Sequence, residues 1–386
     1  MFIHQCYRIR GDLPGFAKNR LRLFFNGDFT AAAIIKLHNL GRKDRSNAKR
    51  QALEMRHCLL QAEEYLQSAK AASLATRPVL IYYAIMSFAL AEILYKGTGM
   101  DRLAKLRENH DAHGLSLIAT GRLDKTIDFR EIASNLIAKP QSRSNGNFFG
   151  TFARWADVTR ESPVPIKFTE YKGAGTSISY RTWLAGQDRS VVNWTRMAHG
   201  CSLLDALRAL PQLGQILAFG AIEPSFVGIR FAGEIGHPQR PETRLSMAVQ
   251  PAPQTLHDTL YSRVLMAPAW VNSIDAFEMS SGHIFHITLD ENSRGSFLSM
   301  PPSITLEEEE TYFLIDDFGL GEFGSLYVAL HIAGNFARYY PDLWVPHVES
   351  SSLLAATIDE LCNVASARLP IIMASEFDRI YYFGES

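Results

Sequence analysis

The chain lacks the residues that mark several classes of protein. Four cysteines are spread over 386 residues without a C-x-x-C pair, which excludes a zinc site built from cysteines alone and provides no disulfide framework. The 39 Lys and Arg residues are balanced by 40 Asp and Glu, so the formal net charge is −1 and the chain as a whole is no polycation. With a hydrophobic share of 47% and no repeat or low-complexity tract, the sequence is typical of a globular protein from a reducing compartment.

Long apolar runs are also missing. The longest, residues 79–94, carries Glu92 and is shorter than the roughly 20 residues needed to span a bilayer. The N-terminal sequence MFIHQCYRIRGD has charged residues where a signal peptide has its apolar run. We therefore predict a cytoplasmic protein with no membrane association, in which residues 79–94 form a buried helix.

Two helices are predicted near the N-terminus. Over residues 47–73, apolar residues recur at alternating spacings of three and four and mark one stripe: Ala52, Met55, Leu59, Ala62, Leu66 and Ala69. A second helix begins after Thr76, with Pro78 in its first turn, and ends where Gly97 and Gly99 supply a positive φ. Because this second segment is apolar nearly all round, it is predicted to be the central helix of a bundle.

The predicted fold class is α+β. A mainly helical N-terminal domain is expected over residues 1–219, a β-rich region over 220–318 and a C-terminal helical region over 319–386. Short β-prone segments separated by turn residues predict an antiparallel sheet from Phe226–Phe231, Arg244–Val249, Ala276–Glu278, Ile284–Leu289 and Thr311–Ile315. Further helices are predicted at Cys201–Leu217, Ser325–Tyr340 and Ser352–Arg368, and the last two are expected to pack back on the bundle.

The first 56 residues carry a basic excess that the neutral total hides. They hold twelve Lys or Arg and four Asp or Glu. The candidate nucleic-acid-binding residues are Arg42, Lys43, Arg45, Lys49, Arg50 and Arg56, with Arg20 and Arg22 earlier in the same segment. Such a cluster predicts contacts with the phosphates of RNA or DNA. The alternative is an ordinary solvated helix face.

The loop ENHDAHG brings histidines close to an arginine. The candidate catalytic residues are Arg107, His110 and His113, whose spacing resembles the arginine-to-histidine signature of HEPN ribonucleases. That resemblance implies that a histidine activates a ribose 2′-hydroxyl or protonates the leaving oxygen, and that the arginine stabilises charge on phosphorus. Arg107 precedes His113 with five residues between, but Arg50 and His57 stand at a comparable spacing. The alternative is therefore a polar loop whose histidine packs against a helix or caps it.

Metal and nucleotide motifs are weak. Glu54-x-x-His57 and Glu234-x-x-His237 repeat the carboxylate–histidine step of di-iron bundles, but the second copy falls in a Gly/Pro-flanked loop. Gly319-x-Gly321-x-x-Gly324 follows a predicted strand and opens a predicted helix, yet no parallel strand is predicted after it. We predict a glycine-rich turn there, and neither a metal nor a cofactor.

Several longer segments carry a family resemblance. RPVLIYYAIMSFALAEILYKG, AHGLS, DFREIASNLIAKPQSRSNGNFFGTF, LYVALHIAGNFARYYPDLWVPH and RLPIIMASEF follow one another along the chain. Together they resemble the YaaC-like family, bacterial proteins of unassigned activity, over the full length of the chain. The resemblance is thinnest over residues 226–315.

Residues 48–118 also resemble the helical HEPN group, in which a Tyr- and Ala-rich helix precedes a His-Gly step. That resemblance implies a helical bundle and a setting in antiviral defence or stress. With the basic segment, it predicts a component that binds nucleic acid or a protein partner of the same system, with oligomerisation left open. The alternative that it implies is a metal-independent ribonuclease.

Overall fold

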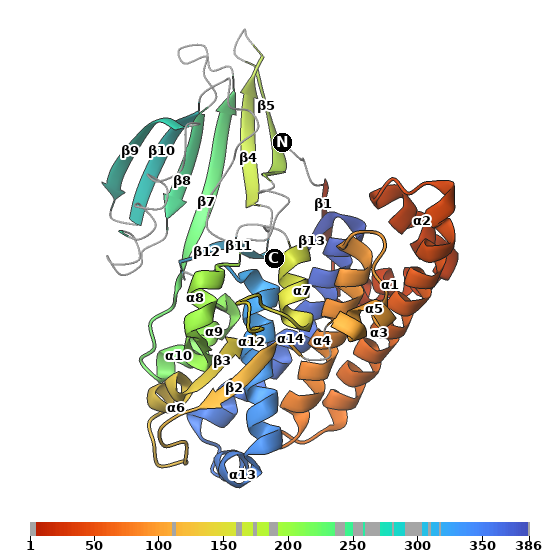
Figure 1. Ribbon diagram of the computed structural model, residues 1–386. Helices are drawn as coiled ribbons and strands as arrows, with labels where there is room; N and C mark the ends of the chain where they lie inside the picture. The colour runs from red at the N-terminus through yellow and green to blue at the C-terminus, as the bar shows by residue number, and fades with distance from the viewer. Residues whose placement is uncertain are drawn as a thin grey trace.

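The structure is a computed structural model that describes residues 5–109, 113–159, 164–172, 176–184, 192–235, 244–249, 258, 271–279, 282–289, 303–307, 310–315 and 318–384. Most helices gather in one body, and the larger β-sheet projects from it (Figure 1). The two ends of the chain meet where sheet and helices join, because β1 (Gln5–Ile9) pairs in parallel with β13 (Ile380–Gly384).

The N-terminal part of the chain supplies the long helices of the body. They are α1 (Leu13–Leu23), α2 (Gly27–Leu37), the 3-10 helix η1 (Arg42–Asp44), α3 (Arg45–Ala71) and α4 (Arg77–Lys96). All six residues of the predicted apolar stripe of α3 are buried, and this stripe packs along α4. The helix predicted over residues 47–73 is thus confirmed within two residues at each end.

Helix α4 is the central helix that the sequence predicts. Among the described helices it alone is long and apolar enough to cross a membrane, but 72% of that segment is buried inside the protein. It packs against α3, against α7 and against two C-terminal helices described below. The prediction of a buried core helix is confirmed.

The two ends of α4 differ in detail from the start and stop signals read from the sequence. Thr76 stands at the N-cap, yet its side chain makes no capping hydrogen bond. Gly97 ends the helix with a φ of −58°, and the positive φ falls at Gly99 (+74°). Gly97 is favoured for a different reason: a Cβ there would lie 2.7 Å from the backbone carbonyl oxygen of Ile93 and would also meet the carboxylate of Asp101.

Short helices and strands follow α4. The helices are α5 (Leu103–Asn109), α6 (Phe129–Asn135), α7 (Thr151–Val158), α8 (Trp194–His199), α9 (Leu203–Arg208), the 3-10 helix η2 (Pro211–Leu213) and α10 (Gly214–Phe219). A small antiparallel sheet is formed by β2 (Leu115–Ala119), β3 (Leu136–Pro140) and β6 (Cys201–Ser202). The prediction of one helix over Cys201–Leu217 is wrong, because Pro211 cannot donate a backbone hydrogen bond and splits the segment into α9, η2 and α10.

The larger sheet contains the predicted strands and others that the sequence analysis missed. Its strands beside β1 and β13 are β4 (Val164–Tyr171), β5 (Ser177–Leu184), β7 (Phe226–Ile235), β8 (Arg244–Val249), β9 (Val271–Met279), β10 (Gly282–Leu289), β11 (Ser303–Glu307) and β12 (Glu310–Leu314). The path runs β1-β13-β11-β12-β7-β8-β10-β9, and β4 pairs with both β5 and β7. Most pairs are antiparallel, but β4 runs parallel to β7 and β13 runs parallel to β11.

The C-terminal helices return to the bundle. They are α12 (Gly321–Tyr339), α13 (Pro341–Glu349) and α14 (Leu353–Asp378), and both α12 and α14 pack on α4 as predicted. At Gly334 the backbones of α12 and α4 come so close that a Cβ would lie 2.9 Å from Cβ of Tyr82. The α+β class is confirmed, while the boundaries at residues 219 and 318 stay a prediction.

Candidate functional site

A cavity of about 590 Å³ lies between α3, α4, α5 and the start of α7. Its polar lining consists of His57, Gln61, Arg107, His113, Thr151 and Arg154. Its apolar wall is formed chiefly by Met86, Leu90 and Ile93 of α4 and by Leu103 and Leu106 of α5. No Asp or Glu is among the described residues that line it.

Two of the three candidate catalytic residues meet at this cavity. Arg107, in the last turn of α5, is exposed and its Nε donates to the carbonyl oxygen of Leu103 at 3.3 Å. Both terminal guanidinium nitrogens stay free of this bond and can reach a ligand. His113 follows α5 and lies just before β2. His110 lies outside the described residues.

His113 rests on aromatic and sulfur atoms of α4. Its Nδ1 is 3.0 Å from Sδ of Met86, and its ring meets Tyr82 and Tyr83 edge-on at centroid distances of 5.9 and 6.5 Å. Burial, and then the positive charge of Arg338, lower the pKa of His113 below its ordinary value of 6.5. The imidazole is therefore neutral near neutral pH and can accept a proton.

A second histidine, His331, contacts the same tyrosine as His113 does. Nδ1 of His331, on α12, is 3.2 Å from the hydroxyl oxygen of Tyr82. Burial, with a contribution from His113, lowers the pKa of His331 to about 3, so this side chain carries no charge at neutral pH. The ring of Tyr82 thus lies between the two histidines, with centroid distances of 5.3 Å to His331 and 5.9 Å to His113.

Arg154 is held in place by carboxylates outside the cavity. Its Nη2 donates to Oδ1 of Asp101 at 3.1 Å, and its Nη1 is 3.5 Å from Oδ2 of Asp157. Asp101 also accepts from the backbone N–H of Thr98. Hydrogen bonds from Thr98 and the charge of Arg154 outweigh burial and lower the pKa of Asp101, which keeps the pair ionised.

One face of α3 connects the cavity with the basic segment. Arg50, Glu54, His57 and Gln61 are spaced by four, three and four residues, which places them on one side of a helix. Glu54 accepts from Arg102 Nη2 at 2.7 Å, so its carboxylate faces α5 and is already paired. In the Glu54-x-x-His57 motif, the carboxylate of Glu54 is therefore used in an ion pair with Arg102. Among the described residues, no group of three His, Cys, Asp or Glu side chains is placed so that it could hold a metal ion.

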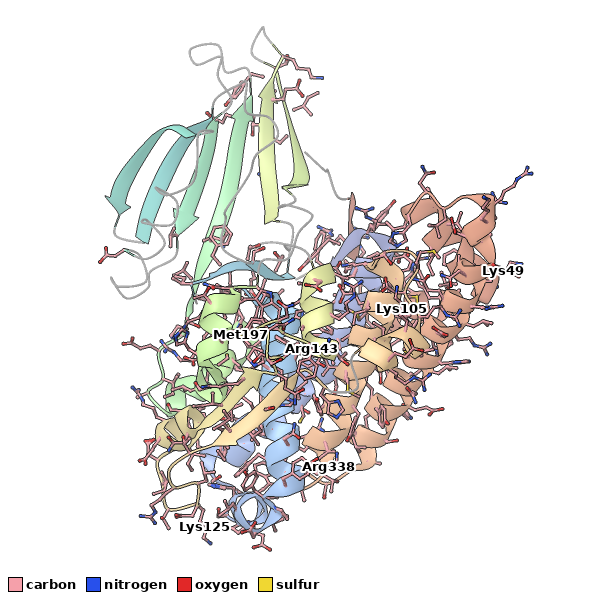
Figure 2. The ribbon with its side chains drawn as sticks, viewed as in Figure 1. Lys49, Lys105, Lys125, Arg143, Met197 and Arg338 are labelled. Atoms are coloured by element: carbon pink, nitrogen blue, oxygen red, sulfur yellow. The ribbon has the colours of Figure 1, made fainter. Side chains whose placement is uncertain are left out.

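The six candidate nucleic-acid-binding residues all lie on the surface. Arg42 and Lys43 belong to η1, while Arg45, Lys49, Arg50 and Arg56 belong to α3, and every one is exposed. None of them forms an ion pair with another described residue. Figure 2 shows Lys49 at the outer edge of the helical body, away from the larger sheet. We call these six residues the basic surface.

Arg20 and Arg22 do not belong to it. Arg20 donates through Nε and Nη2 to both carboxylate oxygens of Asp378, at 2.9 and 2.8 Å, and so ties α1 to the end of α14. Arg22 is paired with Glu63 of α3. Both arginines are committed to packing helices together, which corrects their grouping with the basic segment.

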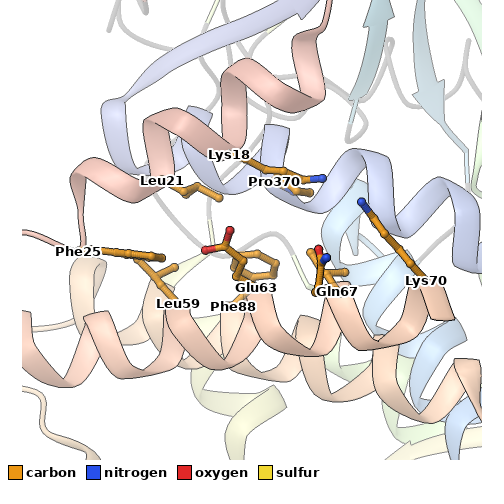
Figure 3. A pocket seen from close by; sticks show the side chains of 10 residues that line it. Lys18, Leu21, Phe25, Leu59, Glu63, Gln67, Lys70, Phe88 and Pro370 are labelled. Atoms are coloured by element: carbon orange, nitrogen blue, oxygen red, sulfur yellow. The ribbon is translucent and has the colours of Figure 1, made fainter. Parts of the chain in front are cut away.

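A second cavity, lined by Lys18, Glu63 and Lys70 among others, lies between α1, α3 and α14 (Figure 3). At about 50 Å³ it has room for water but not for an organic ligand, which ordinarily needs roughly 300 Å³ or more.

The glycine motif is a turn between β12 and α12. Gly319 and Gly321 have φ values of +66° and +64°, and a Cβ at Gly324 would lie 3.0 Å from Cη2 of Trp155. Strand β12 has antiparallel neighbours on both sides, β11 and β7. The motif therefore serves chain reversal and close packing, as predicted, and lacks the parallel strands of a dinucleotide site.

The sequence analysis missed His57, Gln61, Thr151 and Arg154 as parts of the cavity. Only the seven-residue step from Arg50 to His57 signals that one residue of the basic surface shares a helix face with the cavity.

Comparison with known proteins agrees with the pattern of segments spread along the chain. No curated protein and no solved structure matches it. The family model described as "YaaC-like Protein" matches residues 23–377, which include every helix and strand that builds the cavity and the basic surface. The chain therefore belongs to the YaaC-like family.

Proposed function

We propose that this protein binds nucleic acid along the basic surface. The observation that carries the proposal is that six exposed cations lie along η1 and the first half of α3 without an ion-pair partner in the described chain. Elsewhere on the helical body, arginines such as Arg20, Arg77 and Arg102 are paired with carboxylates. Unpaired cations concentrated along one short stretch of helix favour a polyanion.

The dimensions of the surface suit a single strand. Residues 42–56 extend over about 20 Å at 1.5 Å per helical residue, which matches about six phosphates at the spacing of one strand of B-form DNA. Leu53, 46% exposed, lies on α3 among the cations and offers apolar contact to a sugar or base. The setting that we propose with it is the cytoplasm of a bacterium, in a defence or stress system, as the HEPN-like resemblance implies.

Reversing two charges tests this proposal. Arg45→Glu with Arg50→Glu should weaken binding to single-stranded RNA or DNA by roughly 10- to 100-fold at low salt. It should also flatten the slope of log affinity against log salt by about two, because two phosphate contacts are lost. Fluorescence anisotropy over a series of salt concentrations measures both effects.

The matched control carries the same change of charge elsewhere. Arg122 and Lys125 are exposed and lie outside the basic surface, and Figure 2 shows Lys125 far from Lys49. Arg122→Glu with Lys125→Glu should leave binding within about twofold, since surface changes away from contacts have small effects. Equal losses in both double variants, or no binding by the native protein, would reject the proposal; retention of an acidic protein instead would identify a protein partner.

A second candidate is metal-independent cleavage of RNA, and the shared cavity of Arg107 and His113 favours it. Neutral His113 would take the proton of a ribose 2′-hydroxyl while that oxygen bonds to phosphorus. The bond from phosphorus to the 5′-oxygen then breaks, and water protonates the leaving oxygen. Arg107 would neutralise the charge on the phosphorus oxygens.

Cleavage would have three signatures. It should survive a chelator, and it should fall by roughly 10²–10⁴-fold in His113→Ala. It should also rise with pH through a pKa below 6.5, because burial lowers the pKa of His113 and only the neutral ring acts as a base. His199→Ala is the control, since His199 is an exposed histidine of α8 whose Nδ1 lies 2.8 Å from the carbonyl oxygen of Thr195. Undiminished cleavage in His113→Ala would exclude this role.

A further inference from the structure

The lining of the cavity combines polar side chains with an apolar wall. We call the polar side chains, which are His57, Gln61, Arg107, His113, Thr151 and Arg154, the polar end of the cavity, and none of them belongs to the basic surface. We propose that this cavity binds one nucleotide, with the phosphate at the polar end and the base against the apolar wall. The inference goes beyond strand binding on the basic surface, because the side chains of the cavity would bind a free mononucleotide as well as the end of a strand.

The size of the cavity fits such a ligand. Its volume of about 590 Å³ lies within the range of roughly 300–1,000 Å³ that is usual for small-molecule sites. Met86, Leu90 and Ile93 are spaced by four and three residues and present one apolar face of α4. Leu103 and Leu106 of α5 line the same space, which leaves a slot between two helices for a planar heterocycle.

The polar end fits a phosphate. Arg107 and Arg154 line the cavity from α5 and α7, and His57 lines it from α3. Helix α7 begins at Thr151 without a side-chain cap, since its N-cap is Gly150, and of its first N–H groups that of Phe152 donates to the carbonyl oxygen of His113 at 3.1 Å. The positive end of this helix and the guanidinium group of Arg107 act on the same space. Arg154 adds N–H donors, but its charge is shared with Asp101 and Asp157, which lie outside the described lining.

His113 adds a polar contact for the nucleoside. Because Nδ1 lies 3.0 Å from Met86 Sδ, Nε2 is the ring nitrogen that can meet a ligand. A neutral imidazole pairs with a ribose hydroxyl or with a base edge without adding charge. The cavity thus combines the three contacts that a nucleotide needs: cations, an apolar slot and one neutral hydrogen-bonding group.

Calorimetric titration of the full chain tests the proposal with four probes: a set of 5′-mononucleotides, the matching nucleosides, inorganic phosphate and a 5′-phosphorylated oligonucleotide. Mononucleotides should bind at least about tenfold more tightly than nucleosides or phosphate alone, because only they use both ends of the cavity. If only the phosphorylated oligonucleotide binds, and its affinity depends on Arg107, the source of the nucleotide is the end of a strand.

Variants assign the binding to the cavity. Arg107→Gln should weaken nucleotide binding about tenfold and leave nucleoside binding unchanged, since it removes one charged contact with phosphate. Lys105→Gln, on the same helix but outside the cavity lining, should change neither (Figure 2). Leu90→Trp should fill the slot and abolish binding of nucleotide and nucleoside alike, in a protein whose melting temperature shows that it is folded.

The outcomes separate this inference from strand binding. Arg45→Glu with Arg50→Glu should keep its affinity for a free mononucleotide even though it loses the strand. The inference is overturned if neither mononucleotide nor strand end binds, if phosphate alone binds as tightly as the nucleotide, or if Arg107→Gln and Lys105→Gln behave alike.

Discussion

Replacing Lys96 with methionine is expected to destabilise the protein by roughly 3–5 kcal/mol, because the change leaves a buried carboxylate without its partner. Lys96 stands in the last turn of α4, and its Nζ donates to Oε1 of Glu92 at 2.8 Å and to Glu376 of α14. The side chains of Lys96 and Glu92 are 3% and 2% exposed. Urea unfolding measures the loss.

The cluster also connects α4 with the cavity. The second oxygen of Glu92 accepts from Nε1 of Trp155 at 2.8 Å, and Trp155 stands next to Arg154 on α7. Ile93, the neighbour of Glu92, lines the cavity. Loosening this cluster would therefore displace α7 and the polar end of the cavity as well as lower stability.

The pH dependence of the variant is governed by Glu92. Burial raises the pKa of Glu92 above its usual range, while Lys96 opposes that rise. Without Lys96 the pKa rises further, and an acid whose pKa is raised in the folded state contributes stability at low pH that is lost as pH increases through that pKa. The deficit of Lys96→Met should thus be smaller in mild acid than at neutral pH.

Two further variants make the expectation sharp. Glu92→Gln with Lys96→Met removes the two most buried charges, leaves only the partly exposed carboxylate of Glu376, and keeps an acceptor for Trp155, so it should recover most of the loss. Lys70→Met, at an exposed lysine in the last turn of α3, should change stability by less than about 0.5 kcal/mol. If Lys96→Met were as stable as Lys70→Met at neutral pH, the buried charge would not be what the lysine compensates.

Local patterns were enough to predict the helices of the bundle. The apolar stripe of α3 and the all-round apolar surface of α4 are properties of consecutive residues, and burial of each follows from its own periodicity. Gly99 and Pro78 mark helix ends through their own backbone limits. Such features need no knowledge of the partner element.

Pairings between distant segments were not predictable in this way. Arg20 and Asp378 are separated by 358 positions, and β1 pairs with β13, which lies at the opposite end of the chain. Strands β4 and β5 were not predicted, because nothing in their residues identifies β7 as the partner of β4. Register and partner are set by packing of the whole protein.

The candidate site likewise contains residues that local sequence patterns identify and residues that only the folded structure brings together. Arg107 and His113 are close in sequence, so a motif could bring them together. His57 on α3 and Arg154 on α7 join them only because α3, α4, α5 and α7 surround one space. The six cations of the basic surface were identified from composition, but only the structure separates them from Arg20 and Arg22, whose carboxylate partners lie on other helices.

The other large effect is expected at Arg368, where methionine should again destabilise the protein by roughly 3–5 kcal/mol. Nε and Nη2 of Arg368, on α14, donate to the two carboxylate oxygens of Glu322 at 2.6 and 2.8 Å. Glu322 lies in the first turn of α12 and also accepts from Gln212 Nε2 at 2.6 Å. The side chains of Arg368 and Glu322 are only 11% and 7% exposed, so removing the arginine leaves a buried carboxylate without its partner.

This ion pair also reaches the larger sheet. Nη2 of Arg368 donates to the carbonyl oxygen of Thr305 in β11 at 3.2 Å, and the hydroxyl of Tyr381 in β13 donates to the same oxygen at 3.0 Å. We therefore expect Arg368→Met to increase hydrogen exchange in β11 and β13 more than in α3. Arg368→Lys should be intermediate, because it keeps the charge but cannot bond to both carboxylate oxygens and to Thr305 at once.

A uniform rise in exchange over the whole chain would contradict this assignment, since it would show a loss of global stability without a local role at the junction. Glu322→Gln with Arg368→Met provides the matched comparison: it leaves no buried charge and should regain most of the unfolding free energy. It should not restore protection of β11, because the bond to Thr305 is still missing. Stability and attachment of the sheet would then separate in one pair of variants.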